Sequence, residues 1–120
     1  MTQVVTISTH VLNTATGKPQ KGVPVKLEVL TGNGSTWDQV SAESIETNSD
    51  GRIDSPFKHT LAVNENTATF RLRFETKDAS VFYPYVEIVF VVQRTTGEDK
   101  QHLHIPLLLS PYAYSTYRGS

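Results

Sequence analysis

Imidazole, phenol and guanidinium side chains that could carry out chemistry occur in segments far apart in the sequence. His10 lies in an apolar N-terminal stretch, His104 lies near the C-terminus, and Tyr117 and Arg118 belong to the last four residues. Histidine suits proton transfer near neutral pH because its unperturbed pKa is about 6.5. The planar guanidinium of arginine holds anionic or carbonyl-rich ligands through paired hydrogen bonds. These residue types indicate proton transfer on a planar polar ligand, if the fold brings them together.

Two predicted strands would point both histidines away from the core. In residues 4–12 and in residues 101–109 the odd positions are mostly apolar and form a core face. Successive side chains of a strand point to opposite faces. His10 and His104, at even positions, are therefore predicted to lie on an outward face, which they share if the two strands lie in one sheet.

The tyrosine-rich end of the chain predicts a final strand over residues 112–118 and an ordered terminus. If Tyr112 and Tyr114 are buried, Tyr117 joins the two histidines on the outward face. That face combines small residues, an aromatic ring and Leu108, and it carries almost no lysine or glutamate. Surfaces of this composition are typical of contact surfaces. We therefore expect an oligomer interface or a groove that contains the histidines.

Period-two patterning along most of the chain predicts an all-β fold. Residues 67–75 alternate most clearly, and Val86–Gln93 is apolar on both faces, which favours a central strand covered on both sides. Thr76–Phe82 is predicted as one short helix capped by its threonine. Seven to eight strands and this helix favour an antiparallel β-sandwich. The other strands are expected over residues 4–12, 23–30, 37–45, from about Arg52, 101–109 and 112–118.

Composition limits the classes of protein that fit. The 120 residues suit one domain over residues 1–120 with a core that needs neither disulfides nor metals. A net charge of -1 provides no field for nucleic acid or anionic lipid. The absence of cysteine excludes a thiolate zinc site and a cysteine nucleophile. The apolar runs fall far short of the ~20 residues of a membrane span, so neither nucleic acid nor membrane is expected as a partner.

Some candidate residues also have ordinary structural interpretations. His59 and His102 are interpreted as structural or solvated histidines, and Arg71 and Arg73 as the solvated side of a strand. His102 and His104 point the same way and could hold a metal, but no third ligand lies nearby in the sequence. A site without metal or cofactor is expected, and zinc stays the alternative. Serine-hydrolase, phosphate-loop and zinc-protease motifs are missing from the sequence.

Four segments carry a recognisable pattern: residues 9–15 with 17–19 and 22–25, residues 47–52, residues 102–112 and residues 114–120. Together they resemble the transthyretin-related 5-hydroxyisourate hydrolases. Their order and spacing extend over nearly the whole chain, and the terminal Tyr-Arg-Gly-Ser separates these hydrolases from the hormone-carrying transthyretins. Asn13 stands where the family often has aspartate, which could alter the support of His10.

The resemblance implies a two-sheet, transthyretin-like sandwich assembled as a homotetramer, with active sites where dimers meet in a central channel. It implies hydrolysis of 5-hydroxyisourate to 2-oxo-4-hydroxy-4-carboxy-5-ureidoimidazoline in urate degradation, by histidine-assisted attack of water on a cyclic amide. It leaves open which histidine is the general base. By motif match the implied catalytic residues are His10, Arg52 and His104, and the implied substrate-binding residues are His10, Arg52, Tyr117, Arg118 and Ser120.

Two other functions and three compartments are weighed against this interpretation. The same channel could carry a hydrophobic ligand, or the outward face could merely join subunits, since fold alone does not confer function. The N-terminus shows no basic region followed by an apolar stretch, and the chain ends in Arg-Gly-Ser rather than a peroxisomal signal. The cytoplasm is therefore expected, with peroxisome and periplasm as the alternatives.

Overall fold

The computed structural model describes residues 1–41 and 43–119, which form strands and turns without a helix. The all-β prediction is confirmed. None of the described segments could cross a membrane as a long apolar helix. The strands of the described residues are β1 (Gln3–Ser8), β2 (Val11–Asn13), β3 (Lys18–Pro19), β4 (Pro24–Thr31), β5 (Thr36–Gln39), β6 (Ile45–Glu46), β7 (Phe57–Leu61), β8 (Thr67–Glu75), β9 (Tyr85–Gln93), β10 (Lys100–His104), β11 (Leu107–Leu109) and β12 (Tyr114–Thr116).

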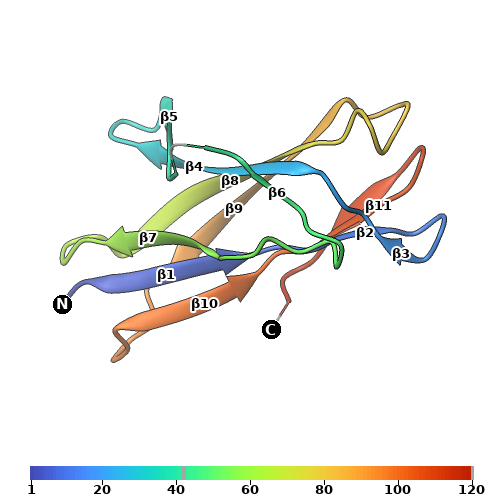
Figure 1. Ribbon diagram of the computed structural model, residues 1–120. Coiled ribbons are helices and arrows are strands. Elements are labelled where there is room, and N and C mark those ends of the chain that lie inside the picture. Colours follow the sequence, from blue (N-terminus) through green and yellow to red (C-terminus); the bar gives the residue numbers. More distant parts are fainter. Residues whose placement is uncertain (42, 120) are drawn as a thin grey trace.

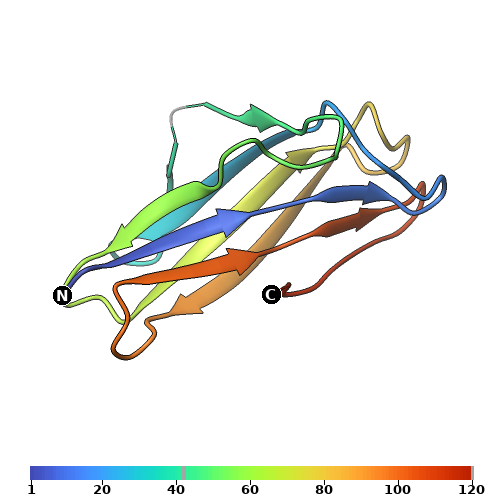
Figure 2. The same cartoon turned by 60° about the horizontal axis from the view of Figure 1, so that its bottom comes forward.

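The strands form two layers (Figures 1 and 2). One layer has the order β10-β1-β7 and continues into β12-β11-β2-β3, while the other has the order β5-β4-β8-β9 with β6 beside β4. The continuation follows from two interrupted strands, β1 with β2 and β10 with β11. Pro106 lies in the second interruption, where its missing N–H cannot join the ladder. Backbone bonds from Leu107 N to His10 O (2.8 Å) and from Ile105 N to Ser8 O (2.9 Å) keep the two interrupted strands paired.

The apolar positions fill the space between the layers as the alternation predicts. Val5, Ile7 and Val11 are fully buried, and so are Phe70 and Leu72 of the opposite layer. Burial of such a side chain stabilises the fold by about 1.5–3 kcal/mol. The same alternation turns the even positions of β1 and β10 toward the outer face, where the chemistry-bearing side chains lie. The core face of residues 101–109 is likewise buried at Leu103, Ile105, Leu107 and Leu109.

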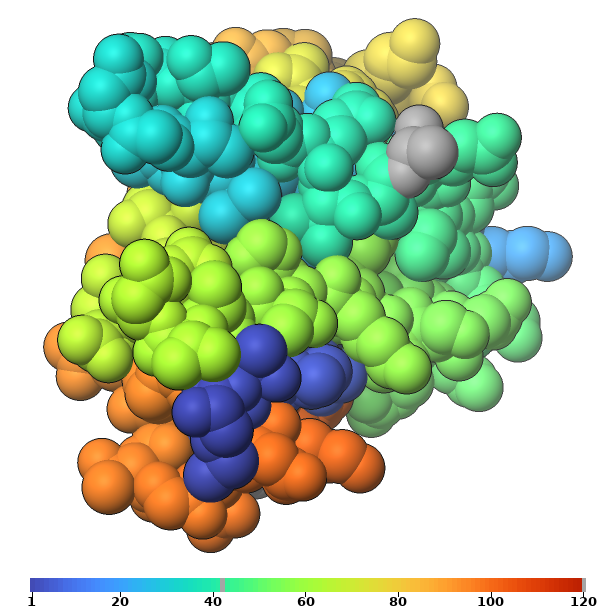
Figure 3. Space-filling view, turned by 90° about the vertical axis from the view of Figure 1, so that its left-hand side faces the viewer, coloured from blue at the N-terminus to red at the C-terminus, as the bar shows by residue number. Residues whose placement is uncertain are grey.

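Buried polar contacts fix the start of β1, and with it the register of the strand that carries the site residues. The Gln3 side chain is fully buried, and its Nε2 donates to Thr95 O (3.0 Å) and Glu98 O (2.8 Å). Arg94 donates to Met1 O (2.9 Å), which ties the N-terminus to the same turn. In Figure 3 the blue N-terminal residues lie between the lime-green and orange segments that include β7 and β10.

The predicted helix over Thr76–Phe82 is wrong. Ser80 N donates to Thr76 O (2.8 Å), which makes a single turn. The Thr76 hydroxyl donates to Tyr83 O (2.6 Å) instead of accepting from a helix amide. Thr76 N also donates to Pro84 O (3.1 Å), so both ends of the segment are tied together as a loop. Pro84 disfavours a helical conformation for the residue before it, and this favours the loop.

Several strand predictions also need correction. The sandwich is not wholly antiparallel, because β1 pairs with β10 and β2 with β11 in parallel. Among the described strands β9 pairs with β8 alone, so it is an edge strand rather than a covered central one, and Val89 and Val91 are exposed. The strand expected near Arg52 begins only at Phe57. The described residues form more strands than the seven or eight predicted. Two long strands are interrupted, and β3 and β6 are additional strands of two residues each.

Candidate active site

A pocket of about 460 Å³ lies on the outer face of the layer that contains β1 and β10. It brings together side chains from four parts of the chain: the end of β1, the turn before β7, β10 and the C-terminal tail. The residues that line it are Ser8, His10, Arg52, His102, His104, Tyr117 and Gly119.

His104 is held by the pairing of β10 with β1. The parallel register sets His104 beside Ser8, and the Ser8 hydroxyl lies 2.8 Å from His104 Nδ1. His102, two residues earlier, projects to the same face and also lines the pocket. His104 is half-buried and lines the pocket.

The turn before β7 delivers Arg52 to His10. Asn48 Oδ1 accepts hydrogen bonds from Asp50 N (2.9 Å) and Arg52 N (3.1 Å), and Asn48 N donates to Arg52 O (2.8 Å). Arg52 then forms an isolated antiparallel bridge with His10. The Asn-Ser-Asp-Gly-Arg segment is thus a hydrogen-bonded turn that brings Arg52 beside His10 at the pocket.

Gly51 allows the turn with Arg52 to lie close to the backbone at His10 and Val11. Its φ of 74° lies in the left-handed region, and a Cβ built there would lie 2.5 Å from Val11 O and 3.1 Å from His10 Cδ2. Because that Cβ would strike backbone, only glycine allows Val11 N to donate to Gly51 O (2.8 Å).

The C-terminal tail closes the other side of the pocket. After β12 pairs with β11, Gly119 N donates to His104 O (2.7 Å) and forms a second isolated bridge. A Cβ on Gly119 would lie 2.9 Å from His104 Cδ2, so the tail backbone packs directly against the imidazole. Tyr117 lines the pocket and remains 56 % exposed, so its ring can still meet a ligand. The burial expected for Tyr112 and Tyr114 is wrong, because both side chains are exposed.

Both pocket histidines that face Arg52 are shifted toward the neutral form. The pKa of His104 is lowered by burial and by the positive charges of Arg52, His10 and His102. The pKa of His10 is lowered by burial and by Arg52, while the backbone and carboxylate of Asp50 act in the opposite direction. Each ring is therefore mostly uncharged near pH 7, as a general base has to be.

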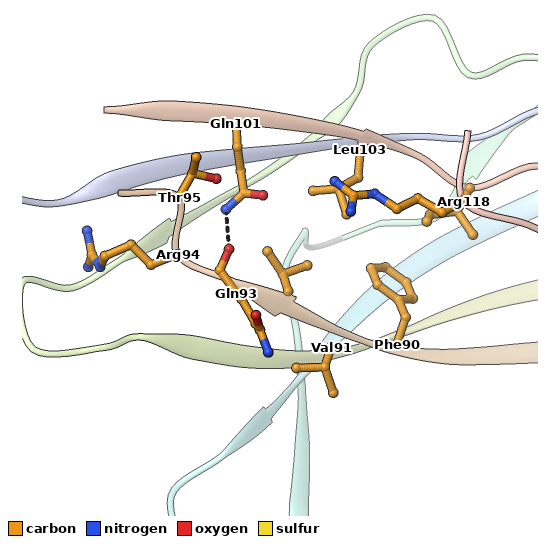
Figure 4. A pocket seen from close by; sticks show the side chains of 10 residues that line it. Phe90, Val91, Gln93, Arg94, Thr95, Gln101, Leu103 and Arg118 are labelled. Atoms are coloured by element: carbon orange, nitrogen blue, oxygen red, sulfur yellow. Dashed lines mark hydrogen bonds between the residues drawn. The ribbon is translucent and has the colours of Figure 1, made fainter. Parts of the chain in front are cut away.

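The structure brings four of the implied site residues together: His10, Arg52, His104 and Tyr117. Arg118 lies elsewhere, in a second pocket of about 440 Å³ between the two layers, where Figure 4 shows its side chain extending toward Leu103. Ser120 lies outside the described residues.

Two further residues behave as structural side chains. Asn13 accepts from Ala15 N (3.0 Å) and donates to Gln20 Oε1 (3.2 Å), so it organises its own turn. The His59 ring packs edge-on against Phe70, with ring centroids 5.3 Å apart. His59 thus has the structural role expected from the sequence.

Sequence reasoning missed three pocket residues: Ser8, His102 and Gly119. Alternation already places Ser8 and His102 on the outward face, but it does not show which outward residues touch. The parallel register supplies that information, since it sets Ser8 between the two histidines of β10. Within residues 1–41 and 43–119, no set of three histidine or carboxylate side chains is arranged to hold a metal ion.

The fold and the pocket agree with the comparisons with known proteins. The model of the HIUase/Transthyretin family matches residues 7–119. The chain therefore belongs to the HIUase/Transthyretin family.

Two of the similar proteins are named 5-hydroxyisourate hydrolases, and a third is named for uric acid degradation. The chain is 38 % identical over 120 residues to the 5-hydroxyisourate hydrolase of Deinococcus radiodurans, with 95 % of each chain covered. It is 40 % identical over 125 residues to the uric acid degradation bifunctional protein TTL of Arabidopsis thaliana, covering 95 % of this chain and 37 % of that one. The structure of the 5-hydroxyisourate hydrolase of Klebsiella pneumoniae superposes with a TM-score of 0.67 at 33 % identity, covering 97 % of this chain and 99 % of that one.

Proposed function

We propose that this protein is an enzyme that hydrolyses 5-hydroxyisourate in urate degradation. The observation that carries the proposal is the pocket itself, in which two imidazoles with lowered pKa, a guanidinium and the C-terminal tail up to Gly119 meet. The full-length similarity to proteins named 5-hydroxyisourate hydrolase supports it. A pocket built only to carry an apolar ligand would need neither proton-transfer groups nor a guanidinium.

In the proposed reaction, neutral His104, with His10 beside it, orients a water molecule and accepts its proton. The water oxygen bonds to the carbonyl carbon of the cyclic amide. The carbon–nitrogen bond of the ring then breaks, and the imidazolium returns its proton to the departing nitrogen. General acid–base catalysis of this kind contributes about 10²–10⁴-fold. The product is 2-oxo-4-hydroxy-4-carboxy-5-ureidoimidazoline.

Arg52 and Tyr117 complete the proposed site. Arg52 is exposed at the pocket and lies beside His10, so its guanidinium can bind the substrate and stabilise the charge that develops on the carbonyl oxygen. Tyr117 holds the substrate ring through its hydroxyl. The chemistry of these groups needs no cofactor.

Ultraviolet spectroscopy of freshly made 5-hydroxyisourate tests the function directly. Because this compound decays unaided, the measurement compares its loss in buffer with its loss in the presence of catalytic amounts of protein. We expect acceleration that is proportional to protein concentration. A protein that binds the compound without accelerating its decay would be a carrier, and that result would refute the hydrolase function.

We also propose that the chain is one domain that assembles as a homotetramer. Its Cα radius of gyration is 14.7 Å, close to the ~14 Å expected for a compact domain of this length. Exposed apolar side chains support assembly: Val89 and Val91 on the edge strand β9, and Phe82 and Tyr112 on the loops, are 57–72 % exposed. A solution mass of four 13.3 kDa chains is expected, and a monomeric mass would contradict the assembly.

A further inference from the structure

Hydroxyl and imidazole side chains form a row on the outward face of β1 and β10. The parallel register pairs Thr6 with His102 and Ser8 with His104. Because side chains of both strands alternate, all four project to the same side of the layer. The row begins at Thr6, in the middle of β1, and ends at the pocket with Ser8 and His104.

Ser8 occupies the centre of this row. Its Oγ lies 2.8 Å from His104 Nδ1 and 3.1 Å from His102 Nε2. The remaining nitrogen of His102, Nδ1, lies 2.6 Å from Thr6 Oγ1. With Nδ1 of His104 bonded to serine, Nε2 is the nitrogen of that ring available to a ligand in the pocket.

A hydroxyl group has one proton, so Ser8 can donate to only one of the two rings. If Ser8 donates to His104 Nδ1, neutral His104 carries its proton on Nε2 and can only donate into the pocket. If His104 donates from Nδ1 to Ser8, then Nε2 presents a lone pair and can accept a proton from water. In this second arrangement Ser8 donates to His102 Nε2, and His102 donates from Nδ1 to Thr6.

We propose that Ser8 is a positioning residue that holds the proton of neutral His104 on Nδ1, so that Nε2 faces the pocket as a base. His102 supports this arrangement by accepting the Ser8 proton at its own Nε2. The first histidine of the His-Leu-His motif, His102, thus orients the second, His104, through a shared serine. The inference rests on the hydrolase function proposed above, because it assigns Nε2 as the nitrogen of His104 that acts as the base in that reaction.

Kinetics of Ser8 variants give the first test. Ser8→Ala is expected to lower kcat about tenfold, because ring orientation and protonation site are no longer fixed. KM should stay within about twofold, since Ser8 acts through His104 rather than on the substrate. Ser8→Thr keeps a hydroxyl and should restore most of kcat. Thr60→Ala is the matched control, because Thr60 is exposed on β7 of the same layer and pairs with Val4 rather than with a histidine.

Nitrogen-15 NMR of the imidazoles gives a second test that does not depend on activity. At about pH 8, where the rings are neutral, His104 of the wild-type protein should show a protonated Nδ1 and an unprotonated Nε2. Ser8→Ala should move His104 toward the other tautomer, and Ser8→Thr should not. Failure of the wild-type protein to hydrolyse 5-hydroxyisourate would refute the function and leave this structural result intact.

Two outcomes would overturn the inference. One is the finding that His104 of the wild-type protein carries its proton on Nε2. This outcome can be measured even if Ser8→Ala fails to fold. The other is a folded Ser8→Ala variant with wild-type kcat, or with a defect confined to KM.

Discussion

Replacement of His104 by glutamine is expected to lower kcat by about 10²–10⁴-fold, the usual contribution of a general acid–base group. Glutamine keeps a polar side chain of similar reach beside Ser8 but cannot take up a proton. The side chain lies on the outer face of the layer and is only half-buried, so the core should stay intact. Turnover of 5-hydroxyisourate followed by ultraviolet absorbance, together with circular dichroism of the folded variant, provides the measurement.

His59→Gln is the control for this experiment. His59 lies on β7 and packs against Phe70, away from the pocket residues, so its replacement should leave kcat near the wild-type value. Wild-type turnover by a folded His104→Gln protein would remove His104 from the chemistry.

Arg52→Met is expected to lower kcat/KM by about 10²–10³-fold, because the group that stabilises charge on the carbonyl oxygen is lost. Arg52→Lys should recover only part of the loss, since an ammonium cannot form the paired hydrogen bonds of the guanidinium. Steady-state kinetics of both variants measure these effects.

The Arg52→Met variant has a second expected effect, on the pH profile. The charge of Arg52 lowers the pKa of both His10 and His104. Its removal should raise these pKa values and move the acid limb of the activity toward higher pH. Lys26→Met, on β4 of the opposite layer, removes one positive charge without touching the pocket and should cause neither change. An unchanged acid limb in a folded Arg52→Met protein would place Arg52 outside the site.

The faces of the strands could be predicted from the sequence, whereas contacts between strands could not. Odd positions of the first strand are apolar and fill the core, so the outward position of His10 follows from alternation alone. The partners of a strand depend on the whole fold. The parallel pairing of β1 with β10, which sets Ser8 between two imidazoles, therefore became visible only in the structure.

Predictions from local sequence patterns were wrong where contacts outside the segment decide its structure. The helix signal at Thr76 was overridden because its hydroxyl and amide bond to Tyr83 O and Pro84 O across the loop. The apolar outer face of β9 predicts a strand covered on both sides. In the single chain β9 lies at the edge of its sheet, and Val89 and Val91 on its outer face are exposed.

The C-terminal tail shows what the family resemblance adds to the prediction of the site, and where the structure differs from that prediction. The resemblance implies that Tyr117 and Arg118 both bind substrate. Neighbouring residues of an extended segment point to opposite sides, and the structure follows this rule. Tyr117 lines the histidine pocket, and Arg118 lines the pocket between the layers.

The pH dependence of kcat/KM for 5-hydroxyisourate tests most directly whether an uncharged imidazole in this pocket acts as the base. Because burial and Arg52 lower the pKa of His104 and His10, both rings stay neutral below the usual pKa of about 6.5. We predict constant activity near neutral pH and a loss at lower pH, with a midpoint below that of free histidine. A profile that is flat from about pH 5 to pH 9 would contradict a histidine base.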